Sequence, residues 1–352
     1  MRAFVCSPGS EPALAAEIVR AGAAATELAP GVVASDRDSE DFDPIFSRQP
    51  LPSAHLVEGA SVRALAEAIF GAVETTIDDW PGPFAVHALA HAEPPPGLAS
   101  RATLVAREAL ALLAARRRRA FRRRRSPDEA VAAFDGSWLL VQILALDRDR
   151  FVVSAAPPRP LPRGGLDLAR WPGGEAPVAI DRAPPSRAYQ KLEEAFAWMG
   201  TAPGAGETCV DLGAAPGGWT ATALKRGARV VAVDRAPLAP ALARHPRVAS
   251  VIGNAFTYAP TAPADWLLCD VVCEPPRSLE ICDRWLSAGL CRGLVVTVKF
   301  KGRDGYGLLA ELPQLLEKTR PAFARVKQLG HNKNEVTVMV VRKGQAERAA
   351  AK

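Results

Sequence analysis

The chain has 352 residues, 48% of them hydrophobic, and a net charge of +6, which suits two or three folded domains that are only mildly basic overall. No apolar run reaches the roughly 20 residues that would span a membrane, and the apolar part of residues 1–8 is too short for a secretory signal. These features argue against a membrane-spanning or secreted protein, and we expect a soluble cytoplasmic one.

The N-terminal half predicts a succession of short strands and helices. Apolar residues recur at helical spacing in some stretches and form short runs in others. We expect strands at 2–7, 25–28, 32–34 and 81–91, helices at 12–20, 62–72 and 101–124, a loop with one strand at 36–60, and a β-hairpin at 137–146 and 151–154. This pattern indicates an α+β organisation.

A concentration of arginine lies at the end of the last of these helices. Residues 101–125 contain ten arginines and one acid, Glu108. Such a run can simply be a solvated surface, or it can reflect the compositional bias of a chain that is rich in Arg and Ala throughout. Eight arginines in ten positions, however, repel one another unless a polyanion neutralises them. We therefore predict that RNA contacts Arg116, Arg117, Arg118, Arg119, Arg122, Arg123, Arg124 and Arg125.

Residues 156–185 are rich in Pro, Gly and Arg, which is typical of a linker or surface loop. We place the linker at 161–183, so that the main domain boundary falls there.

From residue 184 onward, expected strands alternate with helices. The strands are at 208–212, 229–233, 248–252, 266–270, 293–299, 324–329 and 336–341; helices begin near 218, 236 and 308, and one ends near 290. This alternation predicts βαβ units and a mainly parallel sheet. Ligands bind at the carboxyl ends of such strands. The candidate residues there are Asp211, Asp234, Asn254, Asp270 and Lys299.

The first of these strands runs into a glycine-rich turn, Asp211-Leu-Gly-Ala-Ala-Pro-Gly-Gly-Trp-Thr220. Its glycines let the backbone pass close to a ligand at the entry to a helix, and the spacing is not the G-x-G-x-x-G of nicotinamide enzymes. Asp234 ends the next strand, where an acid can accept hydrogen bonds from both hydroxyls of an adenosine ribose. Asp234 could instead cap the following helix, but beside this turn we favour the ligand.

This turn resembles the first motif of the FtsJ (RrmJ) group of ribose 2′-O-methyltransferases, in which the Ala-Pro-Gly-Gly turn holds S-adenosyl-L-methionine. The resemblance implies that Asp234 holds the ribose and that Asn254 lies beside the adenine, where the family usually has aspartate. The cofactor-binding residues that it implies are Ser186, Gly213, Ala215, Pro216, Gly217, Gly218, Trp219, Asp234, Asn254 and Asp270.

The same family uses a Lys-Asp-Lys-Glu tetrad, and each member has a match in order. Lys191 lies in Ser186-Arg-Ala-Tyr-Gln-Lys-Leu-Glu-Glu194, just before the first strand. Asp270 and Lys299 end the fourth and fifth strands, and Glu335 opens the last one. Taken singly, a lysine or glutamate of this kind could be a surface ion-pair partner. Four matches in order favour a catalytic set.

A ribose hydroxyl is a weak nucleophile, whereas the sulfonium of S-adenosylmethionine supplies a strong leaving group. The site must therefore align the reactants and take up one proton. A lysine accepts a proton only in its neutral form, which burial and a neighbouring cation favour. We expect Lys299 to be the candidate base or to position the hydroxyl, with Lys191 as the second cation. Asp270 and Glu335 would orient them.

Other methyl-transfer chemistries fit less well. Base N-methyltransferases carry Asn/Asp-Pro-Pro-aromatic after the fourth strand, where this chain has Asp270-Val-Val-Cys-Glu-Pro-Pro-Arg277. Cytosine C5 enzymes need a cysteine after Pro or Thr, a setting that Cys269 and Cys273 lack. The six cysteines also lack zinc-ribbon spacing, so we predict mostly buried thiols in a reducing compartment and no metal site.

The long N-terminal half narrows the resemblance to the RlmM branch, bacterial enzymes that methylate a cytidine 2′-hydroxyl in 23S ribosomal RNA. Lys191-Leu-Glu-Glu-Ala-Phe196 is a more specific match to this branch than the glycine-rich turn. The branch implies a ferredoxin-like domain at 1–60, a THUMP-like RNA-binding domain at 61–160 and a Rossmann-like methyltransferase domain at 184–345. A second interpretation stays open, in which an RNA-binding or ribosome-assembly protein keeps the cofactor site without turnover.

Overall fold

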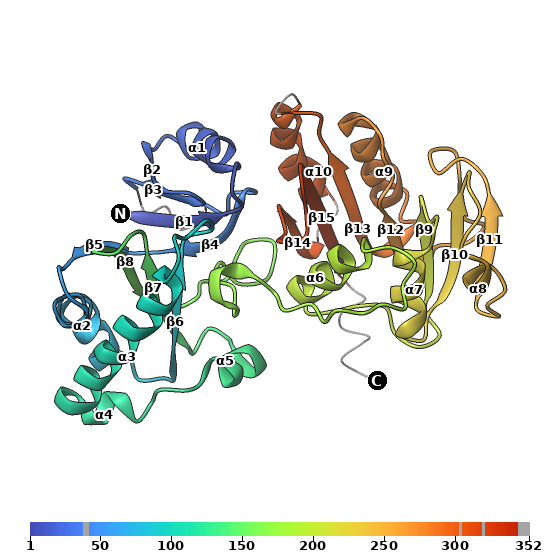
Figure 1. The fold of residues 1–352 in the computed structure, drawn as a ribbon. Coiled ribbons are helices and arrows are strands. Elements are labelled where there is room, and N and C mark those ends of the chain that lie inside the picture. Colours follow the sequence, from blue (N-terminus) through green and yellow to red (C-terminus); the bar gives the residue numbers. More distant parts are fainter. Residues whose placement is uncertain (38–41, 303–304, 319–320, 344–352) are drawn as a thin grey trace. The chain divides into compact units, whose positions relative to one another are not determined.

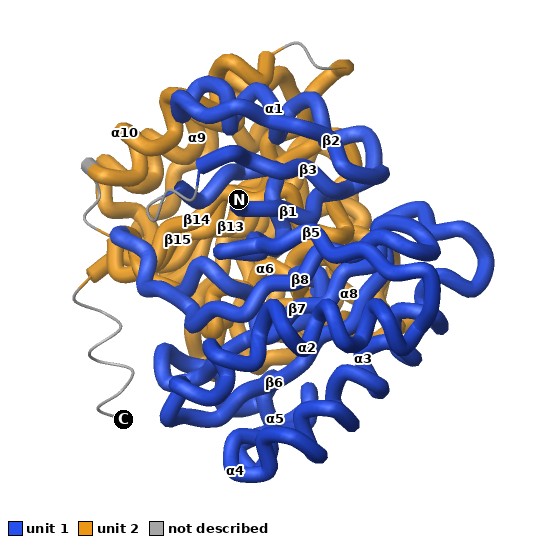
Figure 2. The backbone as a smooth tube through the Cα atoms, turned by 90° about the vertical axis from the view of Figure 1, so that its left-hand side faces the viewer, with its two compact units in different colours: residues 1–162, 166–175 blue, residues 163–165, 176–352 orange. Residues whose placement is uncertain are grey.

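The computed structural model describes residues 1–37, 42–302, 305–318 and 321–343. The chain divides into two compact units, one of residues 1–162 with 166–175 and the other of residues 163–165 with 176–352 (Figure 2). Figure 1 labels the helices and strands of both. Residues 344 and 345, the predicted end of the second domain, lie outside the described residues.

The first unit begins with a four-stranded sheet in the order β2-β3-β1-β4, in which all neighbours are antiparallel. Helix α1 packs against β2 and β3. The elements are β1 (Arg2–Cys6), α1 (Glu11–Arg20), β2 (Ala25–Ala29), β3 (Val32–Ser35) and β4 (Ser47–Leu51). The first three predicted strands and the helix between them are confirmed here.

A second sheet of the same unit has the order β5-β8-β7-β6, and only β6 and β7 are parallel. Helices α2 and α3 bury an apolar core against one of its faces. The elements are β5 (His55–Glu58), α2 (Val62–Asp79), β6 (Phe84–Ala90), α3 (Leu98–Arg116), α4 (Arg118–Phe121), α5 (Pro127–Ala133), β7 (Leu139–Ala145) and β8 (Arg150–Ala156). The predicted β-hairpin is confirmed, and α2 extends beyond residue 72 because Val73 and Ile77 continue its buried stripe.

The prediction of one continuous helix from residue 101 to 124 is wrong. Helix α3 ends at Arg116, and Arg117 leaves the helical conformation with φ −133° and ψ 58°. Like charges three and four positions apart disfavour a longer helix. Beyond the short α4, the chain runs alongside the start of β6, where Phe84 N–H donates to Arg123 O at 3.2 Å and Arg125 N–H donates to Phe84 O at 2.8 Å.

The expectation of a surface loop throughout 156–185 is wrong for residues 166–175. This stretch packs within the first unit, and Leu168, Ala169 and Trp171 are buried. Asp167 is also buried and forms an ion pair with Arg2 at 3.4 Å. The Pro- and Gly-rich composition of 156–185 indicates a loop and does not reveal that these apolar residues and this acid are buried.

The second unit is built on one seven-stranded sheet in the order β11-β10-β9-β12-β13-β15-β14. The five strands from β11 to β13 are parallel, and the pairs β13–β15 and β15–β14 are antiparallel. Its strands are β9 (Thr208–Leu212), β10 (Arg229–Asp234), β11 (Val248–Ile252), β12 (Ala264–Cys269), β13 (Cys291–Lys299), β14 (Pro321–Lys327) and β15 (Glu335–Arg342). The predicted Rossmann-like, mainly parallel α/β architecture is confirmed for this unit.

Helices cover both faces of this sheet (Figure 1). α6 and α7 share an apolar core with β9, β10 and β12, whereas α9 packs against β13 and α10 against β14. The helices are α6 (Tyr189–Met199), α7 (Gly218–Lys225), α8 (Pro240–Ala243), α9 (Pro275–Ser287) and α10 (Leu312–Lys318), with 3-10 helices η1 (Pro172–Gly174), in the first unit, and η2 (Tyr306–Glu311). The helix expected from about residue 236 is only the short α8, and the one expected from 308 starts as η2.

Within the described part of the chain, no helix is long and apolar enough to cross a membrane. Five of the six cysteines are buried and Cys273 is half-buried, as the sequence predicts. The described residues also contain no group of three or more His, Cys, Asp or Glu placed to hold a metal ion.

Candidate functional site

The strand order of the second unit marks a place for a ligand. From β9 the chain moves outward to β10 and β11 on one side, and then returns to β12 and β13 on the other. In open α/β sheets, ligands bind outside the carboxyl ends of the strands where the order reverses. β9 ends at Leu212 and β12 at Cys269, so the glycine-rich turn and Asp270 flank this point.

The glycines of the turn have no room for a side chain. Gly213 and Gly217 have φ angles of 76° and 118°, which side chains disfavour. A Cβ on Gly213 would lie 2.6 Å from Val271 Cγ2, and one on Gly218 would lie 2.3 Å from Ser186 Oγ. The turn is therefore held between the segment before α6 and the segment after β12, with Ser186 beside it.

Asp234, at the end of β10, is tied directly to this turn. Its Oδ2 accepts a hydrogen bond from Ala215 N at 3.0 Å, and its Oδ1 accepts one from Ala236 N at 2.9 Å. Because the next helix begins only at Pro240, Asp234 does not cap it. Asn254 follows β11, and its Oδ1 accepts from Phe256 N at 3.1 Å. The turn, the acid and the amide thus lie at the ends of three neighbouring strands, an arrangement that suits a nucleoside.

Trp219 lies differently from its neighbours in the motif. Its side chain is 3% exposed and belongs to the apolar core that α6 and α7 share. Its Nε1 donates to Ala188 O at 2.8 Å, which fastens the start of α7 to the start of α6. The structure places this indole behind the turn, in the core.

The four predicted catalytic side chains converge. Lys299 Nζ lies 2.8 Å from Asp270 Oδ1 and donates to Asp270 O at 2.6 Å. Lys191 Nζ lies 2.7 Å from Glu335 Oε1 and 3.4 Å from both carboxylate oxygens of Asp270. Their side chains are 6% to 20% exposed, so the cluster is largely buried but still reached by solvent. A surface ion pair, the alternative for each residue taken singly, does not describe this group.

The fold explains this convergence. Lys299 ends β13 and Glu335 opens β15, and the antiparallel register places these two residues directly opposite each other. Asp270 follows β12, the parallel neighbour of β13. Lys191 reaches the group from α6, which packs against β15.

Sequence patterns missed two residues that contact this group, Thr297 and Asn332, and the role of Glu194, which supports it from nearby. Thr297 Oγ1 donates to Asp270 Oδ1 at 2.6 Å, and Asn332 Nδ2 donates to Glu335 Oε1 at 3.3 Å. Glu194 is 1% exposed and accepts from Gly330 N, at 2.7 Å, which ties the loop before β15 to the helix of Lys191. Glu194 belongs to the same sequence motif as Lys191. Its place in that motif is the one feature of the sequence that could have indicated a role for it.

Residues 184–334 match the model of the FtsJ-like methyltransferase family. They form an FtsJ-like methyltransferase domain. The turn, Asp234 and the tetrad all fall within this domain or, for Glu335, directly after its last matched residue. The match supports S-adenosylmethionine as the cofactor.

Curated relatives extend the match to proteins named ribosomal RNA large subunit methyltransferase M. One from Pseudomonas syringae pv. syringae is 39% identical over 184 residues, which cover 48% of this chain and 50% of that protein. One from Pseudomonas fluorescens is 40% identical over 184 residues with the same coverage. The chain thus spans about half the length of the curated relatives it matches. A solved fibrillarin pre-rRNA processing protein from Methanococcus jannaschii aligns with a TM-score of 0.34 and 14% identity over 45% of this chain and 77% of that one, too distant a likeness to carry an argument.

One buried acid of the methyltransferase domain has an unusual proton affinity. Burial raises the pKa of Asp211 from 3.8 to about 7, although the Thr220 hydroxyl, which donates to Asp211 Oδ2 at 2.6 Å, opposes this. Between pH 3.8 and 7 the unfolded chain releases this proton before the folded one does. The contribution of Asp211 to the free energy of unfolding is therefore full below pH 3.8, falls as the pH rises from there, and is lost once the pH has passed about 7.

We expect Asp211→Asn to remove this pH dependence, because the amide oxygen still accepts from Thr220 and carries no charge. The variant should match the wild type only below pH 3.8, lead it by about 1.6 kcal/mol at pH 5, and be the more stable protein at pH 8 by a margin on the order of 4 kcal/mol. Urea unfolding at half-unit steps of pH measures the difference. Equal slopes of stability against pH in the two proteins would show that Asp211 is charged throughout.

The predicted arginine surface is partly neutralised within its own unit. Arg116 pairs with Glu67 on α2 at 2.8 Å. Arg117 pairs with Glu74 at 2.8 Å and with Asp78 at 3.3 Å. A third member of the run, at position 123, donates to two backbone carbonyls at the end of α2. Among the described residues, the side chains at 118, 119 and 122 are exposed and have no acidic partner.

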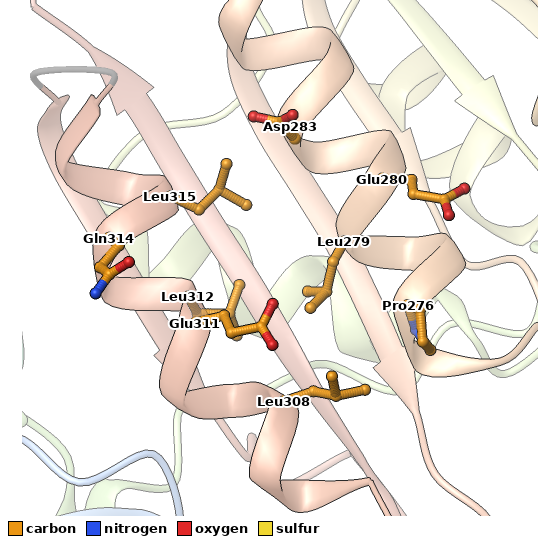
Figure 3. Close-up of a pocket in the computed structure, with 9 residues that line it drawn as sticks. All are labelled: Pro276, Leu279, Glu280, Asp283, Leu308, Glu311, Leu312, Gln314 and Leu315. Carbon is orange, nitrogen blue, oxygen red and sulfur yellow. The ribbon is translucent and has the colours of Figure 1, made fainter.

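A groove between α9 and the η2–α10 segment lies in the same domain (Figure 3). It encloses about 490 Å³ and combines leucines with three acids. Its lining residues are Pro276, Leu279, Glu280, Asp283, Leu308, Glu311, Leu312, Gln314 and Leu315. None of these residues belongs to the turn or the tetrad, so the groove is separate from the site described above.

Proposed function

We propose that the protein methylates a ribose 2′-hydroxyl of ribosomal RNA, with S-adenosylmethionine as the methyl donor. The observation that carries this proposal is the convergence of Lys191, Asp270, Lys299 and Glu335 at the sheet edge that also holds the glycine-rich turn. A buried pair of lysines that shares one carboxylate suits a hydroxyl, which must give up a proton.

Each tetrad residue has a distinct task in this proposal. Lys191 is held by both carboxylates and places its Nζ beside the second lysine. Among the described residues, Lys299 Nζ contacts Asp270 alone, which leaves it able to meet the incoming hydroxyl. Lys299 then takes the proton or aligns the oxygen, while Asp270 and Glu335 orient the two lysines.

The cofactor site follows from the strand ends. The Gly213–Gly218 backbone would receive the methionine end of S-adenosylmethionine, Asp234 the ribose hydroxyls and Asn254 the adenine amine. When bound, this cofactor supplies the electrophilic methyl group on its sulfonium. Trp219 would support the site from the core.

The first unit would hold the RNA. Its order β2-β3-β1-β4 with antiparallel neighbours supports a ferredoxin-like domain, although the described residues between β3 and β4 contain no second helix. The second sheet, with α2, α3 and the arginine run, would be the THUMP-like module. Phosphate contacts from arginine fix the position of an RNA without reading its sequence. A ribose to be modified must then be presented unstacked, and anchoring elsewhere supplies energy for that.

We expect the exposed arginines to carry the RNA contacts. A triple change of Arg118, Arg119 and Arg122 to glutamine should lower the slope of log affinity against log salt by about two to three, because each lost phosphate contact releases one counterion fewer. Fluorescence anisotropy with 23S ribosomal RNA fragments at 50 to 300 mM salt measures the slope.

The matched control is the pair Arg116→Gln and Arg117→Gln, which breaks the ion pairs to α2. This control should leave the salt slope nearly unchanged and affect the stability of the first unit instead. An unchanged salt slope in the triple variant would show that these three arginines do not contact the RNA.

The relatives' name points to the large ribosomal subunit, and the RlmM resemblance points to a cytidine of 23S ribosomal RNA in the cytoplasm. The test is transfer of tritium from labelled S-adenosylmethionine to 23S ribosomal RNA, with 16S ribosomal RNA beside it. Alkali-resistant label in 23S RNA alone supports the proposal. Cofactor binding without transfer to any RNA would favour the second candidate, an assembly protein with an inactive methyltransferase fold.

A further inference from the structure

A pair of threonines lies beneath the tetrad. Thr297 on β13 and Thr337 on β15 are directly opposite each other in the antiparallel register. Each stands two positions from a tetrad residue, Lys299 or Glu335, so its side chain lies on the same face of the sheet. Both threonines are fully buried, with 0% of their surface exposed.

Each hydroxyl supports one carboxylate of the tetrad. Thr297 Oγ1 donates directly to Asp270 Oδ1 at 2.6 Å. Thr337 Oγ1 donates to Asn332 Oδ1 at 3.0 Å, and Asn332 Nδ2 in turn donates to Glu335 Oε1 at 3.3 Å. One threonine therefore supports Asp270 directly, and the other supports Glu335 through Asn332.

The orientation of the Asn332 amide is determined by its neighbours. Its Oδ1 accepts from Leu329 N at 2.8 Å as well as from the Thr337 hydroxyl. Only the oxygen of an amide can accept these two hydrogen bonds, so the NH₂ group must face Glu335. The loop before β15 is therefore built to present a donor to this carboxylate.

We propose that Thr297 and Thr337 are positioning residues that hold Asp270 and Glu335 in the one orientation that serves methyl transfer; this inference rests on the proposed function. Asp270 Oδ1 is shared by Thr297 and both lysines. Without the Thr297 hydroxyl, this carboxylate can rotate toward either lysine. Lys299 Nζ, which it holds, would then lose its alignment with the ribose hydroxyl. A displacement of this size is costly, because transfer depends on the alignment of the reacting atoms. Neutral hydroxyl donors fix the acids without adding charge to the site.

The test is Thr297→Val, which keeps the shape and removes the hydroxyl. We expect kcat to fall about 10- to 100-fold, as for a lost hydrogen bond to a charged group, while KM for RNA and Kd for S-adenosylmethionine stay within about twofold. Thr297→Ser should restore most of kcat. Thr337→Val, which acts through Asn332, should lower kcat about 3- to 10-fold.

The control is Ser154→Ala, which removes a buried hydroxyl that donates to Pro52 O in the first unit. It should lower the stability but leave kcat unchanged. A wild-type kcat in Thr297→Val, or a kcat that Thr297→Ser does not restore, would overturn the inference. If Thr297→Val does not fold, an unaltered kcat in Thr337→Val overturns it instead. An inactive wild-type protein would instead overturn the proposed function itself.

Discussion

Replacement of Lys299 by methionine should lower kcat for methyl transfer to RNA by about 100- to 10,000-fold, the range typical of a lost acid–base group. The methionine keeps the length of the side chain and removes Nζ, which contacts Asp270 at 2.8 Å. Asp270 still accepts from Thr297 and Lys191, so the fold should persist. The affinity for S-adenosylmethionine should stay within about twofold, because the cofactor turn follows a different strand. Single-turnover transfer and calorimetric titration measure the two effects separately.

Lys301 provides the matched control two residues further on. Its side chain is 91% exposed and pairs only with the exposed Glu274, at 3.2 Å, among the described residues. Lys301→Met therefore removes the same charge from nearly the same place without touching the tetrad. Full activity in Lys299→Met, or an equal loss in Lys301→Met, would show that the activity does not depend on this cluster.

Replacement of Gly217 by alanine should abolish tight binding of S-adenosylmethionine. The φ angle of 118° at this position is strained for any residue with a Cβ, at a cost of about 1 to 3 kcal/mol. The added Cβ would also lie 2.3 Å from Leu242 Cδ1. The Leu242 side chain can move aside, but the strained φ angle remains, so the backbone that meets the cofactor must shift to relieve it. We expect Kd for S-adenosylmethionine to rise at least about 10-fold, since each 1.4 kcal/mol corresponds to a factor of ten.

Gly204→Ala is the control for this substitution. Gly204 is outside the positive-φ region, and a Cβ there would meet no atom within 4 Å. This variant should bind the cofactor like the wild type. Binding of RNA should be unchanged in both variants, since the proposed interface lies in the first unit. A wild-type Kd in Gly217→Ala would remove the turn from the cofactor site.

The strand ends were predictable from the sequence because parallel strands bring their carboxyl ends to one edge. That rule, together with the motif resemblance, is enough to select Asp234, Asp270 and Lys299 from the sequence alone. Glu335 was harder, since it opens a strand; the antiparallel register of β15 brings it opposite Lys299.

Other features depend on tertiary contacts that no local pattern carries. Thr297 and Thr337 look like ordinary strand residues, and only the register and the buried carboxylates give them a role. The ion pairs of Arg117 with Glu74 and Asp78 likewise join residues about 40 positions apart in the sequence, so no local pattern reveals them. Asp167 was assigned to a linker because composition does not reveal a buried ion pair.

The most direct test of the central claim is the chemical identity of the methylated nucleoside. 23S ribosomal RNA labelled with the methyl group of S-adenosylmethionine by the full chain should be digested to nucleosides and separated by liquid chromatography with mass detection. We expect label in a 2′-O-methylated nucleoside, and at least about 100-fold slower labelling with Lys299→Met. Label on a base, or label of equal strength in the Lys299→Met reaction, would contradict it.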